Sequence, residues 1–279
     1  MTIDTIIKNA LIEDIREGDH TSLATIPAQA LGKAVLIAKE AGIIAGISVA
    51  EKVFKTVDEH LVFIPEKKDG DVINVGDKIF TVTGKSISIL SAERLALNFM
   101  QRMSGIATAT HKIVQLTQGT NTRILDTRKT TPNLRILEKE AVRLGGGENH
   151  RMGLYDMIMI KDNHIDFAGG IDKAIEACHK YLKDKSKDLK IEIEVRDFNE
   201  LQQVLSHGGI DRIMLDNFTP QDMKKALAQI NGRFETEASG GITSENIRSY
   251  AETGVDFISV GALTHHIKSL DLSLKAIKE

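Results

Sequence analysis

From about Thr122 onward, short apolar runs alternate along the chain with amphipathic stretches. The β-rich runs are TRILDTR, YDMIMIKDNHI, KIEIEV, RIMLDNF, FETEAS and FISVGAL, and helical patterns such as NLRILEKEAVRL, GIDKAIEACHKYLK and TPQDMKKALAQI lie between them. Such alternation is typical of parallel strands joined by right-handed helical crossovers. The pattern therefore predicts an α/β fold with a parallel sheet in this part of the chain.

The ends of these strands favour a barrel over an open sheet. No glycine motif of the dinucleotide-binding type follows the first strand, and polar residues stand at the carboxyl end of nearly every strand. In a parallel α/β barrel these ends meet at one mouth, where the active site lies. Only six strand–helix units are visible, so the predicted barrel is irregular and short of the usual eight.

Residues 1–106 follow a different pattern. They begin with a predicted helix over 3–16, followed by the strand candidates GKAVLIAKE and GIIAGI and a helix near 48–57. The stretch KKDGDVINVGDKIFTVTGKSISIL has two Gly-Asp turns between alternating apolar positions, which predicts a small antiparallel β unit. It is faintly similar to biotinyl or lipoyl carrier repeats, but Lys85 lacks the hairpin tip that a carrier lysine needs. The helix SAERLALNFMQRMSG, with Ser91 as N-cap and Arg94 in its first turn, then leads into the barrel.

Composition and charge argue against several classes of function. The chain has 279 residues, 42% hydrophobic and 27% charged, with a net charge of −3, values that are ordinary for a globular protein and argue against a general nucleic-acid binder. No apolar run approaches the roughly 20 residues of a membrane span, and the N-terminus has no signal-peptide pattern. The one cysteine, Cys178, lies in a helical pattern and is expected to be a structural residue. We expect a cytoplasmic protein that does not act on nucleic acid or membranes.

Cations gather at the predicted barrel mouth. Segment 123–161 holds eight Lys/Arg and five Asp/Glu, a net charge of 8 − 5 = +3 inside an acidic chain. Some of these charges, Arg135, Lys139 and Arg143, fit the solvated face of a helix. The cations at strand ends or in the GGGENHR loop do not fit a helix face, and they predict an anionic ligand. These cations are Arg128, Lys129, His150, Arg151 and Lys161.

Other strand ends carry acids or glycines. Glu194 and Asp216 end adjacent predicted strands, so their carboxylates should lie together, stay ionised, and hold ribose hydroxyls directly or through Mg²⁺. The motifs SGG and VGA each follow a late strand and precede a helical pattern, a setting in which backbone N–H groups bind phosphate. Tight turns and structural carboxylates are the plainer alternatives. The residues of the two glycine motifs are Ser239, Gly240, Gly241, Val260, Gly261 and Ala262.

Four motifs, DTRKTTP, GGGENHR, IKDNH and ASGGI…GVDFISVGALTH, together resemble the quinolinate phosphoribosyltransferase family. They occur in order and span nearly the full chain. Asn133 departs from the glycine that the family usually has after TTP, and asparagine tolerates left-handed backbone. The resemblance implies an N-terminal α/β sandwich over 1–106, to which the tail 266–279 returns, and an irregular barrel of about seven strands over 107–265.

The resemblance also implies an activity and a site. The enzyme would transfer phosphoribosyl from phosphoribosyl pyrophosphate to quinolinate with Mg²⁺ and decarboxylation, giving nicotinate mononucleotide, pyrophosphate and CO₂ for NAD biosynthesis. Alternatives are a fold relative with another acceptor, such as the molybdenum-operon homologue or another pyridine-carboxylate phosphoribosyltransferase, and a non-catalytic phosphosugar-binding barrel. The resemblance implies that quinolinate and pyrophosphate are bound by Arg128, Lys129, His150, Arg151 and Lys161, and that ribose and the metal are bound by Glu194 and Asp216; the catalytic residues among these are Lys129, Lys161, Glu194 and Asp216. It implies that the 5-phosphate is bound by Ser239, Gly240, Gly241 and Gly261, with further substrate contacts from Thr127, Val260 and Ala262. It also implies a dimer or higher oligomer, in which Arg94 reaches into the site of the neighbouring subunit.

Overall fold

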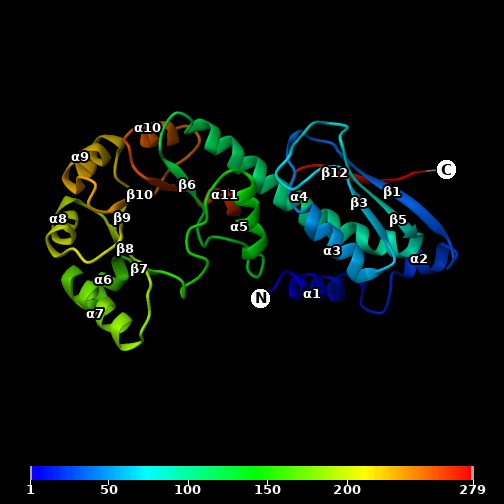
Figure 1. Cartoon of the computed structure of the whole chain (residues 1–279), viewed down its shortest axis with the longest axis horizontal. Helices are drawn as coiled ribbons and strands as arrows, with labels where there is room; N and C mark the ends of the chain where they lie inside the picture. Colours follow the sequence, from blue (N-terminus) through cyan, green and yellow to red (C-terminus); the bar gives the residue numbers. More distant parts are fainter. Residues whose placement is uncertain (1, 278–279) are drawn as a thin grey trace. The chain divides into compact units, whose positions relative to one another are not determined.

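The computed structural model describes residues 2–277, which fold into two compact units (Figure 1). The first unit contains the chain up to His111, the segment 129–146 and the residues from Ala262 on. The second contains 112–128 and 147–261. Segment 129–146, which the sequence places in the barrel domain, thus belongs to the first unit.

The first unit is built on an antiparallel sheet with the strand order β12-β1-β5-β3. Its strands are β1 (Leu31–Ala38), β3 (Val62–Pro65), β5 (Lys78–Lys85) and β12 (Leu272–Ala276), and a separate pair is formed by β2 (Gly42–Ile43) and β4 (Val72–Ile73). Strand β12 pairs with β1, so the end of the described chain returns to this sheet. The prediction of one local β unit is wrong in its pairing, since β4 pairs with β2 while β5 lies between β1 and β3.

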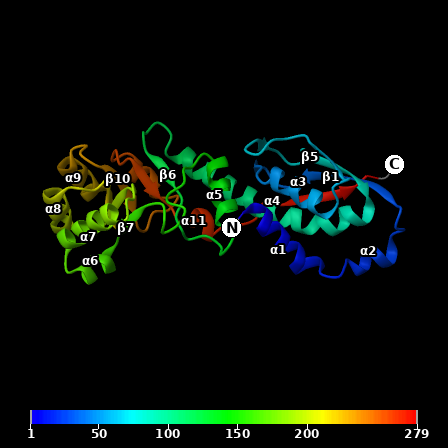
Figure 2. The same ribbon diagram turned by 60° about the horizontal axis from the view of Figure 1, so that its bottom comes forward.

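Six helices belong wholly or mostly to the first unit: α1 (Ile3–Ile15), α2 (His20–Thr25), α3 (Ile47–Val57), α4 (Ser86–Leu116), α5 (Arg135–Leu144) and α11 (Ala262–His265) (Figures 1 and 2). Helix α3 packs on the sheet through Phe54, whose ring centroid lies 6.0 Å from that of Phe63 and 5.8 Å from that of Phe80. Helix α4 begins at Ser86, so the prediction of Ser91 as its N-cap is wrong. Arg94 therefore lies in the third turn rather than the first.

The second unit is an irregular α/β barrel. Its six parallel strands have the order β6-β11-β10-β9-β8-β7 and are β6 (Arg123–Leu125), β7 (Ile158–Ile160), β8 (Ile191–Val195), β9 (Arg212–Asp216), β10 (Glu235–Ser239) and β11 (Phe257–Ser259). Beside β6, Glu148 forms a single parallel bridge with Leu125 at the place of a seventh strand. The predicted fold class is confirmed: an antiparallel α/β unit and an irregular parallel barrel.

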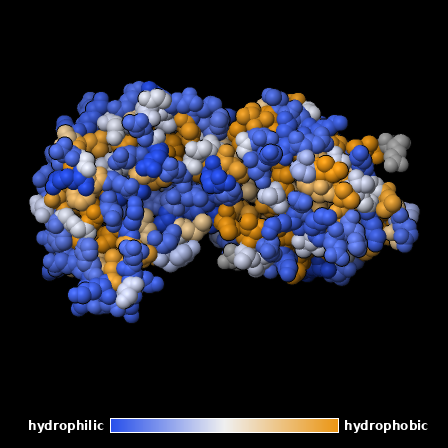
Figure 3. All heavy atoms as spheres, viewed as in Figure 1, coloured by the Kyte–Doolittle hydropathy of each residue, from blue (hydrophilic) through white to orange (hydrophobic). Residues whose placement is uncertain are grey.

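Helices cover the outside of the barrel strands: α6 (Asp162–Ala168), α7 (Ile171–Asp184), α8 (Phe198–His207), α9 (Pro220–Ile230) and α10 (Ile247–Ala251) (Figure 1). Side chains of Asp197 and Thr219 accept hydrogen bonds from the first turns of α8 and α9, which fixes where these helices begin. The face of this unit seen in Figure 3 is mainly hydrophilic, with small groups of apolar side chains among the polar ones. Within residues 2–277, no helix combines the length and apolar character that crossing a membrane would need.

Candidate active site

The predicted strand-end residues of the barrel lie at the carboxyl edge of its sheet. Thr127 and Arg128 follow β6, and Lys161 follows β7. Glu194 lies on β8 and Asp216 ends β9, and these two strands pair in register, so the two acids lie on neighbouring strand ends as predicted. Ser239 ends β10, with Gly240 and Gly241 after it, and Val260 and Gly261 follow β11. Three further predicted residues, Arg94, Lys129 and Ala262, belong to the first unit.

Lys161 and Glu194 form a close ion pair at this edge. The Lys161 Nζ lies 2.5 Å from Glu194 Oε2, with the lysine side chain 42% and the glutamate 11% exposed. The sequence predicted an anionic ligand for this lysine, and the structure adds a protein carboxylate that already contacts it. A ligand anion would therefore have to share Lys161 with Glu194 or replace Glu194 as the partner of the lysine.

Asp216 completes a compact charged group with this pair. Partial burial raises the pKa of the Asp216 carboxyl, and the charge of Glu194 raises it further, while Lys161 opposes both. The side-chain amide of Asn217 donates a 2.6 Å hydrogen bond to Asp216 Oδ2. The main cause of this upward shift is burial, and the neighbouring Glu194 carboxylate adds to it; that both acids stay ionised remains a prediction.

Two arginines lie close enough to affect each other. Burial lowers the pKa of the half-buried Arg151, and the charge of Arg128 lowers it further. Arg151 also donates from Nη1 to the main-chain oxygen of Met157 at 3.1 Å. The two guanidinium groups, Arg151 half-buried and Arg128 exposed, lie near each other, which is the setting that the sequence predicted for an anionic ligand.

The glycine turn after β10 is shaped by left-handed backbone. Gly240 has φ 88° and Gly241 has φ 61°. A Cβ on Gly240 would lie 2.2 Å from Asn217 Oδ1, whereas a Cβ on Gly241 would meet no described atom within 4 Å. Helix α10 begins only at Ile247, so the predicted helix N-terminus does not directly follow this turn. The space beside Gly241 is where the turn can admit a ligand.

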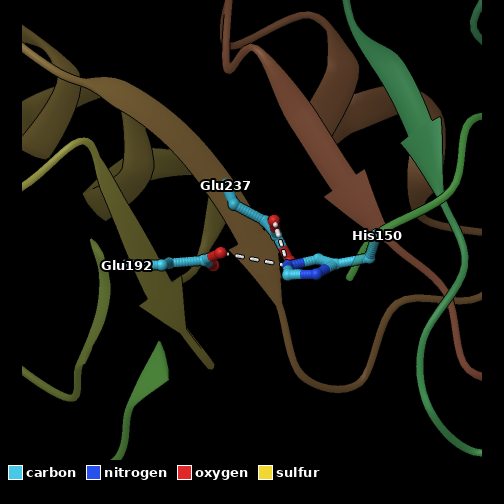
Figure 4. Close-up of side chains that lie close together, drawn as sticks. All are labelled: His150, Glu192 and Glu237. Atoms are coloured by element: carbon cyan, nitrogen blue, oxygen red, sulfur yellow. Dashed lines mark ion pairs between the residues drawn. The ribbon is translucent and has the colours of Figure 1, made fainter. Parts of the chain in front are cut away.

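His150 is more deeply buried than a ligand-binding cation would require. Its Nε2 lies 3.0 Å from Glu192 Oε2 and 3.3 Å from Glu237 Oε2 (Figure 4). Its Nδ1 lies 2.6 Å from the main-chain nitrogen of Arg151. Burial lowers the pKa of the imidazole and the two carboxylates raise it to about 9, but the Arg151 N–H opposes protonation, because it donates to Nδ1 and that nitrogen must then carry no proton. Direct contact between His150 and a substrate stays a prediction.

Several smaller predictions can also be compared with the structure. Asn133 has φ 67°, which is the left-handed backbone that asparagine tolerates, and Gly145 is the C-cap of α5. Lys139 was assigned to a solvated helix face, but its exposed fraction is 0%. Arg94 is exposed on α4, and the Lys129 main-chain oxygen accepts a 2.7 Å hydrogen bond from Thr264 Oγ1.

Glu192, Glu237 and Arg212 are charged residues of the barrel interior that the sequence reading missed. Glu192 stands between two isoleucines on β8, and because interior-facing residues alternate along each barrel strand, this spacing places its charge inside. The signal that could have revealed the two glutamates is an acid at the second or third position of a buried strand.

A parallel barrel that gathers paired acids, clustered cations and an open glycine turn at one edge defines an enzyme class that handles anionic, phosphorylated substrates. Residues 106–275 match the model for the quinolinate phosphoribosyl transferase C-terminal domain, and residues 19–104 match that for the N-terminal domain. The chain belongs to the quinolinate phosphoribosyltransferase family.

Individual relatives are similar over most of their length. The chloroplastic nicotinate-nucleotide pyrophosphorylase [carboxylating] of Arabidopsis thaliana is 46% identical over 98% of this chain and 82% of its own. The probable nicotinate-nucleotide pyrophosphorylase [carboxylating] of Bacillus subtilis is 42% identical over 98% of this chain and 93% of its own. The crystal structure of NadC from Streptococcus pyogenes has a TM-score of 0.93 and 40% identity, and covers 99% of this chain and 97% of its own.

Proposed function

We propose that the chain transfers the phosphoribosyl group of phosphoribosyl pyrophosphate to the ring nitrogen of quinolinate and releases CO₂, forming nicotinate mononucleotide for NAD biosynthesis. One observation carries this proposal: the Lys161–Glu194 pair beside Asp216, at the same strand edge that bears Arg128 and Arg151. Relatives with the names of this activity, at 42% and 46% identity over nearly the whole chain, support it.

The substrates explain why so many cations stand at one edge. Quinolinate has two carboxylates, and phosphoribosyl pyrophosphate has a phosphate and a pyrophosphate. Bringing these anions together costs electrostatic energy that fixed positive charges in a partly dry site offset. We assign quinolinate and pyrophosphate to the cations Arg128, Lys129, Arg151 and Lys161, with His150 among them, and the 5-phosphate to the turns Ser239–Gly241 and Val260–Ala262, with Thr127 as a further contact.

The reaction needs one bond exchange and one decarboxylation. The bond from the ribose carbon to pyrophosphate breaks, its electron pair leaves with pyrophosphate, and a bond to the quinolinate nitrogen forms. The positively charged ring then accepts the electron pair left when the adjacent carboxylate departs as CO₂, and a proton takes the place of that carboxylate. Glu194 and Asp216 hold the ribose hydroxyls and stabilise positive charge on the sugar, while Lys161 exchanges Glu194 for a substrate anion.

Mg²⁺ is the metal that this chemistry implies. Carboxylate oxygens are the ligands it prefers, and Asp216 with Glu194 supplies them, so the residues fit the ion. Because Lys161 already engages Glu194, Asp216 is the protein group better placed to bind a cation held mainly by substrate oxygens. When bound, the ion would neutralise charge on the departing pyrophosphate.

We also propose an oligomer, a dimer or a higher assembly, in which Arg94 completes the site of the neighbouring subunit. Its exposure on α4 leaves the guanidinium accessible for that role. The proposed compartment is the cytoplasm, although relatives in plants carry chloroplastic and mitochondrial in their names.

The acceptor and the need for metal can be tested in one set of assays. Purified protein is mixed with phosphoribosyl pyrophosphate and either quinolinate or nicotinate, with and without a chelator. We expect product from quinolinate only, and only with Mg²⁺. Product from nicotinate alone would instead favour a relative with another acceptor, and binding without product would favour a phosphosugar-binding barrel.

The two glycines after β10 separate phosphate binding from folding. Gly241→Asn should keep the fold, because asparagine tolerates left-handed backbone and the added Cβ meets no described atom. The side chain would occupy the space that we assign to phosphate, so we expect at least about ten-fold weaker binding of phosphoribosyl pyrophosphate, from the loss of charge-assisted hydrogen bonds.

Quinolinate binding to the Gly241→Asn protein should be unchanged in calorimetric titration. Gly240→Val is the contrasting variant, since its side chain would collide with Asn217 and should lower thermal stability. Unchanged affinity of Gly241→Asn for phosphoribosyl pyrophosphate would remove this turn from the phosphate site.

A further inference from the structure

A buried charged column lies inside the barrel. Arg212 begins β9, Glu192 is the second residue of β8, and Glu237 is the third residue of β10. Arg212 is 9% exposed and both glutamates are 0% exposed. The Arg212 Nη1 lies 3.1 Å from Glu237 Oε2 and 3.9 Å from Glu192 Oε2, and the guanidinium lies 4.0 Å above the ring of Phe257. None of these residues has a role in the function proposed above.

His150 lies at the end of this column and is held on several sides. Figure 4 shows its ring reaching between Glu192 and Glu237, which come from different strands. The Arg151 main-chain N–H donates to Nδ1, and the His150 main-chain N–H donates to Asp126 Oδ1 at 2.8 Å. Both edges of the ring and the main chain on each side of it are therefore fixed by protein groups.

Stability alone does not explain two glutamates in this place. By hydrogen-bond geometry, neither oxygen of Glu192 nor the Oε1 of Glu237 has a partner among residues 2–277, although the Oε2 of each glutamate lies 3.0 or 3.3 Å from His150 Nε2. Apolar residues of similar volume usually stabilise a core at least as well as buried charges do. Buried polar groups with so few partners therefore call for a functional explanation.

A bound metal ion is one such explanation, since one ligand atom from each of His150, Glu192 and Glu237 lies within 4.8 Å of the others. However, the Arg212 guanidinium already contacts Glu237 and would repel a divalent cation there. The neighbouring loop offers the other explanation. Residues 149–157 form neither helix nor strand, so the position of Arg151 depends on local contacts, and its main-chain contact with the His150 ring is one of these.

We propose that Glu192 and Glu237 are positioning residues that act through His150. Supported by Arg212, they hold the ring, the ring holds the main chain of Arg151, and Arg151 thereby meets a quinolinate carboxylate at a fixed place. The inference rests on the proposed function, because it assigns Arg151 to quinolinate. The proposal predicts that substitutions in the charged column weaken quinolinate binding and do not change phosphate binding at the turn after β10.

The variants Glu237→Gln and Glu192→Gln test this, because glutamine keeps the size of the side chain and removes its charge. We expect the KM for quinolinate to rise about ten-fold or more in each, while the KM for phosphoribosyl pyrophosphate stays within about two-fold. Glu235→Gln is the matched control: Glu235 Oε2 lies 3.0 Å from the same Arg212 but its side chain is 37% exposed, and its kinetics should equal those of the wild type.

A double-mutant cycle shows whether the effect passes through His150. If it does, adding Glu237→Gln to His150→Asn should change the quinolinate KM little beyond the single His150→Asn change. Additive effects, equal losses for both substrates, or normal kinetics of folded Glu237→Gln and Glu192→Gln would each overturn the inference. A stoichiometric metal ion in the purified wild type that is lost in Glu237→Gln would overturn it too. If Glu237→Gln fails to fold, Glu192→Gln carries the test.

Failure of the proposed function has a different signature. In that case the wild-type protein itself would not turn over quinolinate, whatever the behaviour of the variants. Calorimetric titration of the wild type with quinolinate, run beside the kinetics, separates a protein that binds without reacting from one that does not bind.

Discussion

Replacing Lys161 with alanine is expected to lower kcat/KM by at least about a hundred- to a thousand-fold, the range seen when one fixed electrostatic contact to a transition state is removed. The Nζ of Lys161 lies 2.5 Å from Glu194 Oε2 and acts on Asp216, so its loss leaves two acids close together at the point where substrate anions bind. The side chain is 42% exposed, and we expect the free energy of unfolding to change by no more than about 1–2 kcal/mol. Steady-state kinetics and thermal unfolding of the same samples measure both.

The chain offers a control for the lysine charge itself. Lys190 also pairs with a glutamate, at 3.6 Å from Glu235 Oε2, but it precedes β8 and so stands at the opposite edge of the sheet. Lys190→Ala should therefore keep normal kinetics. A folded Lys161→Ala enzyme with wild-type kcat/KM would remove Lys161 from the catalytic group.

Mixing two inactive variants, Arg94→Ala and Lys161→Ala, is expected to restore roughly a quarter of wild-type activity. A two-fold dimer is reciprocal, so each site would combine the barrel of one subunit with Arg94 of the other. In a mixed dimer one site then collects both defects and the other collects none. About half of randomly exchanged dimers are mixed, and each has one intact site of two, which gives the quarter.

This experiment needs proof that subunits exchange. Differently tagged variants, unfolded together, refolded and separated by tag, supply the mixed dimer directly. A purified mixed dimer that stays inactive would mean that Arg94 serves its own subunit or has no role in the site. Arg94 is exposed on α4 in either case, and the purified mixed dimer distinguishes the two.

The sequence predicted the barrel and its edge residues because both depend on local patterns. Alternating runs gave the parallel strands, and residues that directly follow a strand must lie at its carboxyl end, which placed Lys161 and Asp216 correctly. Which strands and which side chains pair depends on the three-dimensional fold, not on the local sequence. The sequence therefore missed that Lys161 contacts Glu194 and that β4 pairs with β2 rather than with β5.

The sequence also failed to predict where some helices begin and which charged residues are buried. SISIL reads as a strand by its alternation, yet it forms the first turn of α4 because it continues into a long helical pattern. IKDNHI reads as the end of a strand, whereas α6 begins at Asp162 and the ring of His164 accepts a hydrogen bond from the Lys161 N–H. The partners of His150 come from β8 and β10, far away in sequence, and no local pattern brings them together.

The central claim is that one active site both transfers phosphoribosyl to quinolinate and decarboxylates it. The most direct measurement uses quinolinate labelled with ¹³C in the carboxylate next to the ring nitrogen, together with phosphoribosyl pyrophosphate and Mg²⁺. The proposed function predicts nicotinate mononucleotide, pyrophosphate and labelled CO₂ in equal amounts, with all three lost together in Lys161→Ala. Labelled quinolinate that is recovered intact, or a nucleotide product that retains the label, would contradict it.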